Sequence, residues 1–368
     1  MTVNYRTDSR IVLTLDTGGT NMVFGAMQRG EFIVEPLILP AHADNLELCL
    51  NTMVEGFRAI IDQLEERPAA ISFAFPGPAD YPNGIIVGPL LNFPSFSEPV
   101  ALGPYLKKKF SMPVYINNDG DLFAYGEALG GMLPEVNEML DEFGSRKQYR
   151  NLLGFTLGTG FGIGMIVNGQ LNRGDNSCIE MFSMPYRGHE NVFAEEGISI
   201  RAVKRIYGEL SGNPEHGLEP VDIFEIAEGL REGDAEAAKG AFAQMGQVLG
   251  DTIATTVSIT DGLVVIGGGL AGAYKYIKDS MFETLRSKMY RLNGEPIDKL
   301  ASKVYDLDDS EEFKLFLKGE KKNIRIYNSE IEVTYDSQKR IGICLSKLGA
   351  NKAISLGAYA FALNQLSR

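Results

Sequence analysis

Residues 11–27 read IVLTLDTGGTNMVFGAM and carry the first strong structural signal of the chain. Two strand-type runs, 11–15 and 22–27, flank a short segment made of Asp16, Thr17, Gly18, Gly19 and Thr20. Strand-type runs joined by a glycine-rich segment are typical of a β-hairpin. We therefore expect a hairpin here, with a turn that contains one acid, two hydroxyl side chains and two glycines.

A second stretch, residues 152–167, repeats this pattern and reads LLGFTLGTGFGIGMIV. Its two strand-type runs enclose Gly158, Thr159 and Gly160. The two stretches lie roughly 140 residues apart, whereas solenoid repeats have a period of about 20–50 residues. The repeat predicts two related domains, each of which contributes one glycine-rich hairpin to a shared cleft.

Strand-type and helix-type segments alternate along the chain, which favours an α/β fold. We expect strands at 70–75, 114–116 and 263–266, and helices at 46–64, 99–110, 122–130, 198–210, 222–230, 235–256 and 351–366. Residues 298–340 are highly charged, so we expect an insertion there with an exposed hairpin at 324–335. The predicted domains are an N-terminal lobe over 1–125, completed by the C-terminal helix at 351–368, and a C-terminal lobe over 126–350.

The bulk composition restricts the partners of the protein. Its 368 residues are 44% hydrophobic and 23% charged, which suits two globular domains. A formal net charge of −13 disfavours nucleic acid and acidic membranes. No apolar run reaches the ~18–20 residues of a membrane span, and residues 1–10 lack the apolar core of a signal peptide. We therefore expect a cytoplasmic protein with no membrane or nucleic-acid partner.

The two glycine-rich loops are the places where an acidic chain could hold an anionic nucleotide. Phosphates need backbone N–H groups at close approach, hydroxyl groups and a magnesium ion. The candidate phosphate-binding residues are Asp16, Gly18, Gly19, Thr20, Gly158, Thr159 and Gly160, with Asp16 contacting magnesium through water. Either loop alone could be a purely structural turn, but the pair in matching strand contexts favours phosphate binding.

Phosphoryl transfer to a hydroxyl group also needs a general base. Asp119 follows a predicted strand and precedes a predicted helix, so that its side chain can project into a cleft. The alternative is that Asp119 only caps this helix. Asn118, Glu180 and Glu195 are candidates for binding sugar hydroxyls by residue type, because carboxylates and amides form hydrogen bonds in fixed directions.

Six stretches make the chain resemble the ROK family (repressor, open reading frame, kinase) of the actin and hexokinase superfamily. In the order of the family they are LTLDTGGTNMVFG at 13–25, FAFPGPAD at 73–80, INNDGDLFAYGEALGG at 116–131, TLGTGFGIGMIVNG at 156–169, VVIGGGLA at 264–271 and SLGAYAFAL at 355–363. The resemblance implies a two-lobed actin/hexokinase-like fold, a duplicated ribonuclease H-like unit with an interdomain cleft. It also implies phosphorylation of a hexose or hexose derivative by ATP with Mg²⁺, as in a glucokinase.

The resemblance further implies individual roles. Asp119 would be the general base, and the sugar would be bound by Asn92, Asn118, Glu180 and Glu195. The phosphates would lie near Gly158, Thr159 and Gly160, and adenosine near Gly268 and Gly269. A homodimer is a further expectation from the family.

The chain departs from the family pattern beside the sugar site. Ser183 stands where the family has a histidine, and residues 186–196 replace its cysteine-rich zinc loop without any cysteine. The three cysteines of the chain, Cys49, Cys178 and Cys344, also lie far apart. We therefore expect no structural zinc, and a sugar pocket shaped by other contacts.

Two alternative functions remain open. A sugar-binding ROK regulator without catalysis would carry a DNA-binding segment ahead of the first motif, where this sequence has only ten residues before Ile11. A nicotinamide oxidoreductase is suggested by the GxGxxG match at 267–272, although this match lies late in the chain and leaves both glycine-rich hairpins unexplained. The chain has no Walker A or HExxH motif, and its histidines show no ligand spacing: His42, His189 and His216.

Overall fold

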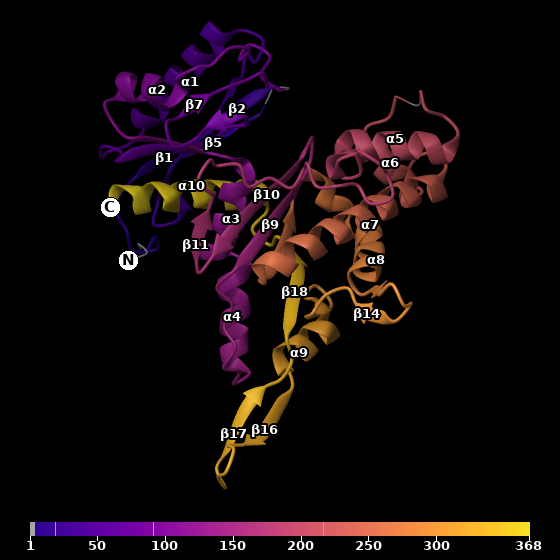
Figure 1. The fold of residues 1–368 in the computed structure, drawn as a ribbon. Coiled ribbons are helices and arrows are strands. Elements are labelled where there is room, and N and C mark those ends of the chain that lie inside the picture. Colours follow the sequence, from indigo (N-terminus) through magenta and orange to yellow (C-terminus); the bar gives the residue numbers. More distant parts are fainter. Residues whose placement is uncertain (1–3, 19, 91, 216) are drawn as a thin grey trace.

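The computed structural model describes residues 4–18, 20–90, 92–215 and 217–368, which form two α/β lobes with two helices between them (Figure 1). The first lobe contains a sheet of order β3-β2-β1-β5-β8, in which β4 also pairs with β2. Its strands are β1 (Val12–Thr17), β2 (Asn21–Gln28), β3 (Glu31–Phe32), β4 (Leu37–Pro40), β5 (Ala70–Ala74) and β8 (Val114–Asn117). A separate small ribbon is made of β6 (Ala79–Asp80) and β7 (Ile85–Ile86).

The predicted first hairpin is confirmed: β1 and β2 are antiparallel, with Leu15 opposite Phe24. Side chains alternate between the two faces of β1, as they must in a strand. Leu13 and Leu15 join an aromatic-rich core with Phe24 and Phe57, while Val12 joins a different core on the other face. The aromatic-rich core is covered by α1 (Leu46–Ile61) and α2 (Leu102–Phe110).

The second lobe contains a sheet of order β11-β10-β9-β12-β18-β15. Its strands are β9 (Leu152–Leu157), β10 (Phe161–Val167), β11 (Gln170–Asn172), β12 (Leu263–Gly267), β15 (Lys303–Asp306) and β18 (Arg340–Leu345). β9 and β10 form the second predicted hairpin, and β12, β18 and β15 run parallel to one another. One face is covered by α5 (Ile200–Ser211), α6 (Pro220–Ala227), α7 (Ala235–Thr260) and α8 (Tyr274–Leu285).

Two helices join the lobes, α3 (Asp119–Gly130) and α10 (Ala350–Leu366). α10 packs on β1 and β5 of the first sheet, α3 packs on β9 and β10 of the second, and the two helices pack on each other (Figure 1). Their crossing is close: a Cβ on Gly126 would lie 1.9 Å from the carbonyl oxygen of Ala353. Only glycine permits this approach, so the sequence of α3 fixes how the lobes meet.

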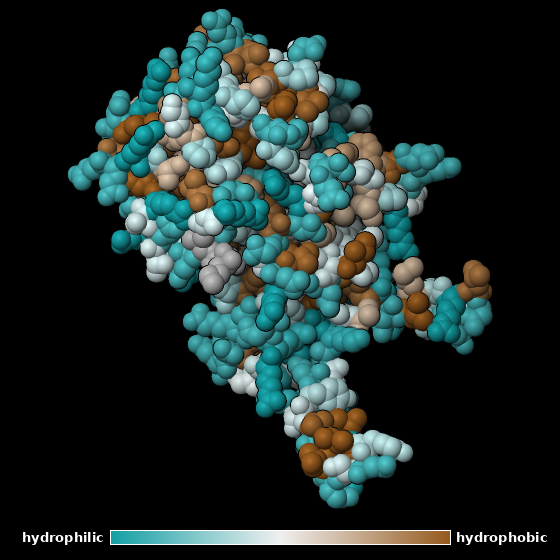
Figure 2. Space-filling view, turned by 60° about the vertical axis from the view of Figure 1, so that its left-hand side comes forward, coloured by the Kyte–Doolittle hydropathy of each residue, from teal (hydrophilic) through white to brown (hydrophobic). Residues whose placement is uncertain are grey.

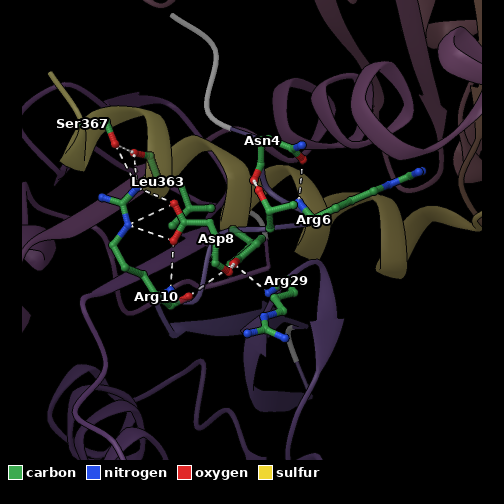
Figure 3. A network of polar contacts seen from close by, with 9 residues as sticks. Asn4, Arg6, Asp8, Arg10, Arg29, Leu363 and Ser367 are labelled. Carbon is green, nitrogen blue, oxygen red and sulfur yellow. Dashed lines mark hydrogen bonds and ion pairs between the residues drawn. The ribbon is translucent and has the colours of Figure 1, made fainter.

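The N-terminal segment secures the end of α10 to the first lobe (Figure 3). The Arg10 guanidinium donates to Asp8 Oδ2 at 2.6 Å and to Ser367 Oγ at 2.9 Å. The Tyr359 hydroxyl donates to the Asp8 carbonyl oxygen at 3.1 Å and accepts from the Arg29 backbone N–H at 2.8 Å. The C-terminal helix is therefore held to the first lobe by hydrogen bonds as well as by packing.

The expectation that all of residues 298–340 form an insertion is wrong. β15 is an edge strand of the second sheet, with Val304 and Tyr305 buried, and α9 (Ser310–Lys318) buries Phe316 and Leu317. Two ribbons do project from this lobe: β13 (Lys288–Tyr290) with β14 (Pro296–Asp298), and β16 (Lys321–Arg325) with β17 (Glu332–Asp336). The exposed hairpin predicted at 324–335 is the second of these ribbons.

The remaining elements are α4 (Met132–Glu142), which continues from α3, and two short 3-10 helices, η1 (Ala194–Glu196) and η2 (Gly269–Ala273). In the part of the chain that the structure describes, no helix has the length and apolar character needed to cross a membrane.

Candidate active site

A cavity of about 1350 Å³ is lined by residues of both lobes. The first lobe supplies the loop that follows β5 and the start of α3, and the second supplies the β9–β10 turn and the loop that leads to η1. Ten of the predicted site residues line this cavity: Asn92, Asn118, Asp119, Gly158, Thr159, Gly160, Glu180, Glu195, Gly268 and Gly269. The structure thus brings together residues that lie up to 177 positions apart (269 − 92 = 177).

Asp119 is the first residue of α3 and follows directly after β8. The N-cap of the helix is Asn118, whose side-chain oxygen accepts from the Gly120 N–H at 2.8 Å. The same N–H also donates to Asp119 Oδ1 at 2.9 Å. Since Asn118 fills the capping position, capping alone does not account for an acid at position 119.

Asp119 is an exposed residue that lines the cavity, although many protein atoms lie around its carboxyl group. This desolvation raises the pKa of Asp119 above its usual range, and the hydrogen bond from the Gly120 N–H opposes the rise. Access to the cavity permits contact with a ligand, while the surrounding protein makes the carboxylate a better proton acceptor.

Other carboxyl groups share the electrostatic environment of Asp119. Burial, followed by repulsion from Asp119 and Glu195, raises the pKa of Glu180 to about 7. Burial and then repulsion from Asp119 raise the pKa of Asp16. Asp121 is almost fully buried, and its pKa is raised to about 7 by burial, with attraction from Arg173 opposing the rise. This concentration of acids favours the binding of a cation or of neutral polar groups that donate hydrogen bonds.

The β9–β10 turn presents glycines to the cavity. The Gly158 N–H donates to the Gly160 carbonyl oxygen at 3.0 Å, which closes the turn. A Cβ on Gly158 would meet no atom within 4 Å, whereas one on Gly160 would lie 2.8 Å from Glu195 Oε2. The turn therefore has open space on one side and a carboxylate against the other.

The Glu195 carboxylate holds this turn in place. Its Oε2 accepts from the Phe161 N–H at 2.9 Å, and its Oε1 accepts from the Arg201 guanidinium at 2.7 Å. A third contact joins the same segments, because the Ile200 N–H donates to the Gly158 carbonyl oxygen at 3.0 Å. Glu195 thus orients the turn in addition to lining the cavity.

Sequence reasoning missed Arg201, the one basic side chain among the lining residues that the structure describes. Its position near the start of α5 gives no local signal, since arginine is common on helix surfaces. It missed Tyr81 as well, which lies in the loop after β5 and donates to the Phe75 carbonyl oxygen at 2.9 Å. The Tyr81 hydroxyl also interacts with the Asn118 side chain, which helps to orient that side chain at the cavity wall.

The remaining predicted residues lie at the first hairpin. Asp16 is near the end of β1 opposite Val23. It lies close enough to Asp119 for the charge of Asp119 to raise the pKa of Asp16. The Gly18 N–H donates to the Asn21 carbonyl oxygen at 2.9 Å, and Thr20 is exposed. Asp16, Gly18 and Thr20 do not belong to the cavity lining, and Gly19 lies outside the described residues.

The loop that stands in place of a cysteine-rich segment is held by backbone and ring contacts. The Tyr186 N–H donates to the Val192 carbonyl oxygen at 2.8 Å, and the Tyr186 and His189 rings lie 4.3 Å apart. The Phe182 and Phe193 rings make an edge contact at 6.4 Å. Across the described ranges, no group of three or more His, Cys, Asp or Glu side chains could hold a metal ion.

Comparison with known proteins relates the chain to sugar kinases and to repressors. A solved glucokinase from Parabacteroides distasonis is 50% identical, with a TM-score of 0.87, and the match covers 98% of this chain and 99% of that one. The curated glucokinase of Thermotoga maritima is 24% identical over 304 residues, which are 76% of this chain and 86% of the relative.

The xylose repressor of Bacillus spizizenii is 26% identical over 145 residues, or 38% of this chain. That match covers only 33% of the length of the repressor. A model described as "ROK family" matches residues 12–307. The fold is accordingly the two-lobed actin/hexokinase-like fold, and the chain belongs to the ROK family.

Proposed function

We propose that the protein transfers the γ-phosphoryl group of ATP to a hydroxyl group of a hexose or hexose derivative, with Asp119 as the general base. The observation that carries this proposal is the Asp119 carboxylate, which opens to the same cavity as the glycine turn at 158–160. A Cβ on Gly162, just beyond that turn, would lie 3.9 Å from Asp119 Oδ1. The similarity to glucokinases supports the same reaction class.

In the proposed step, the sugar hydroxyl oxygen attacks the γ-phosphorus while its proton passes to the Asp119 carboxylate. The bond from the γ-phosphorus to the bridging oxygen breaks, and ADP leaves with that electron pair. The Gly120 N–H fixes Oδ1, so we assign proton acceptance to Oδ2. The raised pKa of Asp119 makes its carboxylate a stronger base than an exposed aspartate.

The sugar would lie beside Asn118, Asn92, Glu180 and Glu195. Glu180 and the two amides would form hydrogen bonds with its hydroxyl groups. A Glu195 carboxylate held at both oxygens is rotationally fixed, and each oxygen keeps a further lone pair for a sugar hydroxyl. The 6-hydroxyl of an aldohexose is the acceptor that we propose.

The phosphates would lie along the turn at 158–160 and the first hairpin, with adenosine near Gly268 and Gly269. Magnesium usually keeps most of its water and takes one or two carboxylates together with substrate phosphates, so the mutual repulsion of Asp16 and Asp119 fits such an ion. Asp16 would contact it through water, and Gly18, Gly19 and Thr20 would complete the phosphate site. When bound with ATP, the ion would supply positive charge to the phosphate oxygens.

Approach of the two lobes would complete the site, because the first hairpin belongs to the first lobe and the glycine turn to the second. Such closure would exclude water and align the hydroxyl with the phosphorus, and alignment of this kind can lower a barrier by ~7–11 kcal/mol. The glycine-permitted contact between α3 and α10 lies where the lobes meet, and we assign the hinge to it.

The test is ADP release from ATP and Mg²⁺ across a panel of aldohexoses, N-acetylhexosamines and ketoses. One sugar should give strong turnover, and Asp119→Asn should abolish it while sugar binding persists. A sugar-binding regulator is the second candidate, favoured by the partial match to a xylose repressor. Saturable sugar binding without turnover for any sugar of the panel would support that candidate and contradict the kinase.

A further inference from the structure

Arg173 is a charged residue that the proposed mechanism does not use. Hydrophilic residues cover much of the face of the molecule shown in Figure 2, as is usual for charged side chains in contact with water. Arg173, by contrast, is partly buried. A charge that gives up part of its hydration needs partners in the protein, and Arg173 has one on the first sheet and another on a helix that packs on that sheet.

The side chain of Arg173 bridges the two lobes. Arg173 directly follows β11, at the edge of the second sheet. Its Nη1 donates to Asn117 Oδ1 at 2.9 Å, and Asn117 is the last residue of β8 in the first sheet. The guanidinium carbon lies 5.1 Å from the centroid of the Phe361 ring on α10, a position in which a cation is attracted to the aromatic ring.

The bridge lies beside the crossing of α3 and α10. β11 packs on α3 (Figure 1), and Arg173 attracts Asp121 in the first turn of that helix. A Cβ on Gly357, one turn before Phe361, would lie 2.0 Å from the Leu122 carbonyl oxygen, so the two helix backbones touch here. Because displacement is smallest beside a hinge, a bridge at this place can persist while the lobes approach each other.

The hydrogen bond to Asn117 supports the segment that leads to the proposed base. Asn117 is fully buried and directly precedes Asn118 and Asp119. Within the described ranges, no group pairs with its Nδ2, while Arg173 supplies a partner to its Oδ1. A buried polar atom without a partner costs free energy. Loss of Arg173 would therefore destabilise the end of β8 and allow the two residues that follow it to shift.

Arg173 is also the first residue of the loop that brings Glu180 to the cavity; we call residues 173–180 the Glu180 loop. Residues 175–178 and Glu180 line the cavity. Asp119 repels Glu180, and Glu180 in turn repels Asp121. Arg173 opposes this repulsion, because its positive charge attracts Asp121 from the start of the same loop. It thereby holds the Glu180 loop against the start of α3, although both are acidic.

We propose that Arg173 is a positioning residue for sugar binding, which fixes the Glu180 loop relative to Asn118 and Asp119. Arg173 is not one of the described residues that line the cavity, so it acts through these three residues and not on the ligand itself. The inference rests on the proposed function, according to which the sugar lies beside Asn118 and Glu180.

The test measures the binding of sugar and of ATP separately, by calorimetry on the full chain, with kcat measured in parallel. Arg173→Met removes the charge and the donor but keeps most of the side-chain length. It should raise the sugar dissociation constant about tenfold, which corresponds to the loss of one hydrogen bond, and lower kcat about a hundredfold, as a misplacement of ~1 Å can. The ATP dissociation constant should change less than about twofold, because none of the described contacts of Arg173 involves the turn at 158–160.

Three further variants separate positioning from a general loss of structure. Arg173→Lys keeps the charge and a donor, and it should restore most of the sugar affinity. Arg187→Met is the matched control: it removes the same groups from an arginine whose ion pair with Asp251 of α7 stays within the second lobe, and it should leave sugar binding unchanged. Asn117→Leu removes the acceptor, and its effect should not add to that of Arg173→Met, because both break the same contact.

The proposal would be overturned by an unchanged sugar dissociation constant in Arg173→Met, by equal weakening of sugar and ATP binding, or by equal effects of Arg173→Met and Arg187→Met. If Arg173→Met does not fold, Asn117→Leu provides the same comparison. A wild type that binds sugar without turnover, and loses affinity in Arg173→Met, would contradict the kinase reaction while supporting the role of Arg173. A wild type that binds no sugar of the panel would overturn both.

Discussion

Replacing Glu180 by glutamine should stabilise the ligand-free protein at pH 8 much more than at pH 5. Burial and the neighbouring carboxylates raise the pKa of Glu180 from 4.5 to about 7. The folded protein therefore binds the proton of the Glu180 carboxyl group more tightly than the unfolded chain does. Stability is lost as pH rises from about 4.5 to about 7, because the unfolded state ionises first and is favoured. Glutamine stays neutral, so the variant lacks this loss.

The size of the effect follows from the gap of about 2.5 between the two pKa values. At pH 8 the wild type should lose ~3 kcal/mol of unfolding free energy through this group, and at pH 5 only ~1 kcal/mol. The stability gained by Glu180→Gln should accordingly grow by ~2 kcal/mol between these pH values. A substitution that stabilises the fold while weakening sugar binding would show that the charge is kept for function.

Urea denaturation of both proteins at pH 5, 6, 7 and 8, at constant ionic strength, measures this difference directly. Glu190→Gln removes an exposed glutamate of the same loop and serves as the control. If the stability difference between wild type and Glu180→Gln were the same at every pH, folding would not raise the pKa of Glu180, and this prediction would be refuted.

Two further substitutions test the packing around the site. Arg201→Met should raise the KM for ATP about tenfold, because Glu195 would no longer be fixed against the glycine turn. The exposed ion pair between Arg201 and Glu195 should contribute less than ~1 kcal/mol to stability. An unchanged KM for ATP would refute this role of Arg201. Gly126→Ala should destabilise the protein by ~3 kcal/mol in urea denaturation, since the new Cβ would overlap the Ala353 carbonyl oxygen. Gly272→Ala, where a Cβ meets nothing within 4 Å, should be nearly neutral, and equal effects of the two substitutions would contradict the account of the helix crossing.

The features that were predicted correctly from sequence share a strong local signature. Both glycine-rich hairpins are short, and each combines strand-type runs with a turn that glycine permits, so the pattern is complete within 17 residues. Long helices such as α7 can also be recognised from the periodic spacing of their apolar residues. The position of Asp119 between a strand and a helix belongs to this group, because the change from strand to helix on either side of it is visible in the sequence.

The features that were missed depend on distant contacts. β15 is a four-residue strand within a charged stretch, and only its pairing with β18 identifies it as part of the sheet. The burial of Arg340 likewise follows from Asp336 and from the ring of Phe316, 5.5 Å from its guanidinium carbon. Local composition describes such residues as solvated because it contains no information about what covers them.

Arg201 shows the same limit at the site. Its contact with Glu195 spans only six residues, yet it depends on η1 and the start of α5 meeting at one angle. The resemblance to a family implies a sugar-binding role for Glu195 and gives no reason to expect that its oxygens hold the glycine turn. The contacts of Glu195 with the Phe161 N–H and with Arg201 became visible only in the structure.

The most direct test of the central claim compares wild type and Asp119→Asn by steady-state ADP release on the preferred sugar, with sugar binding measured by calorimetry. Asparagine keeps the size of the side chain and cannot accept the hydroxyl proton. We predict a loss of kcat of about 10³-fold, with the sugar dissociation constant changed less than about threefold. Turnover close to that of the wild type would contradict the assignment of Asp119 as the general base.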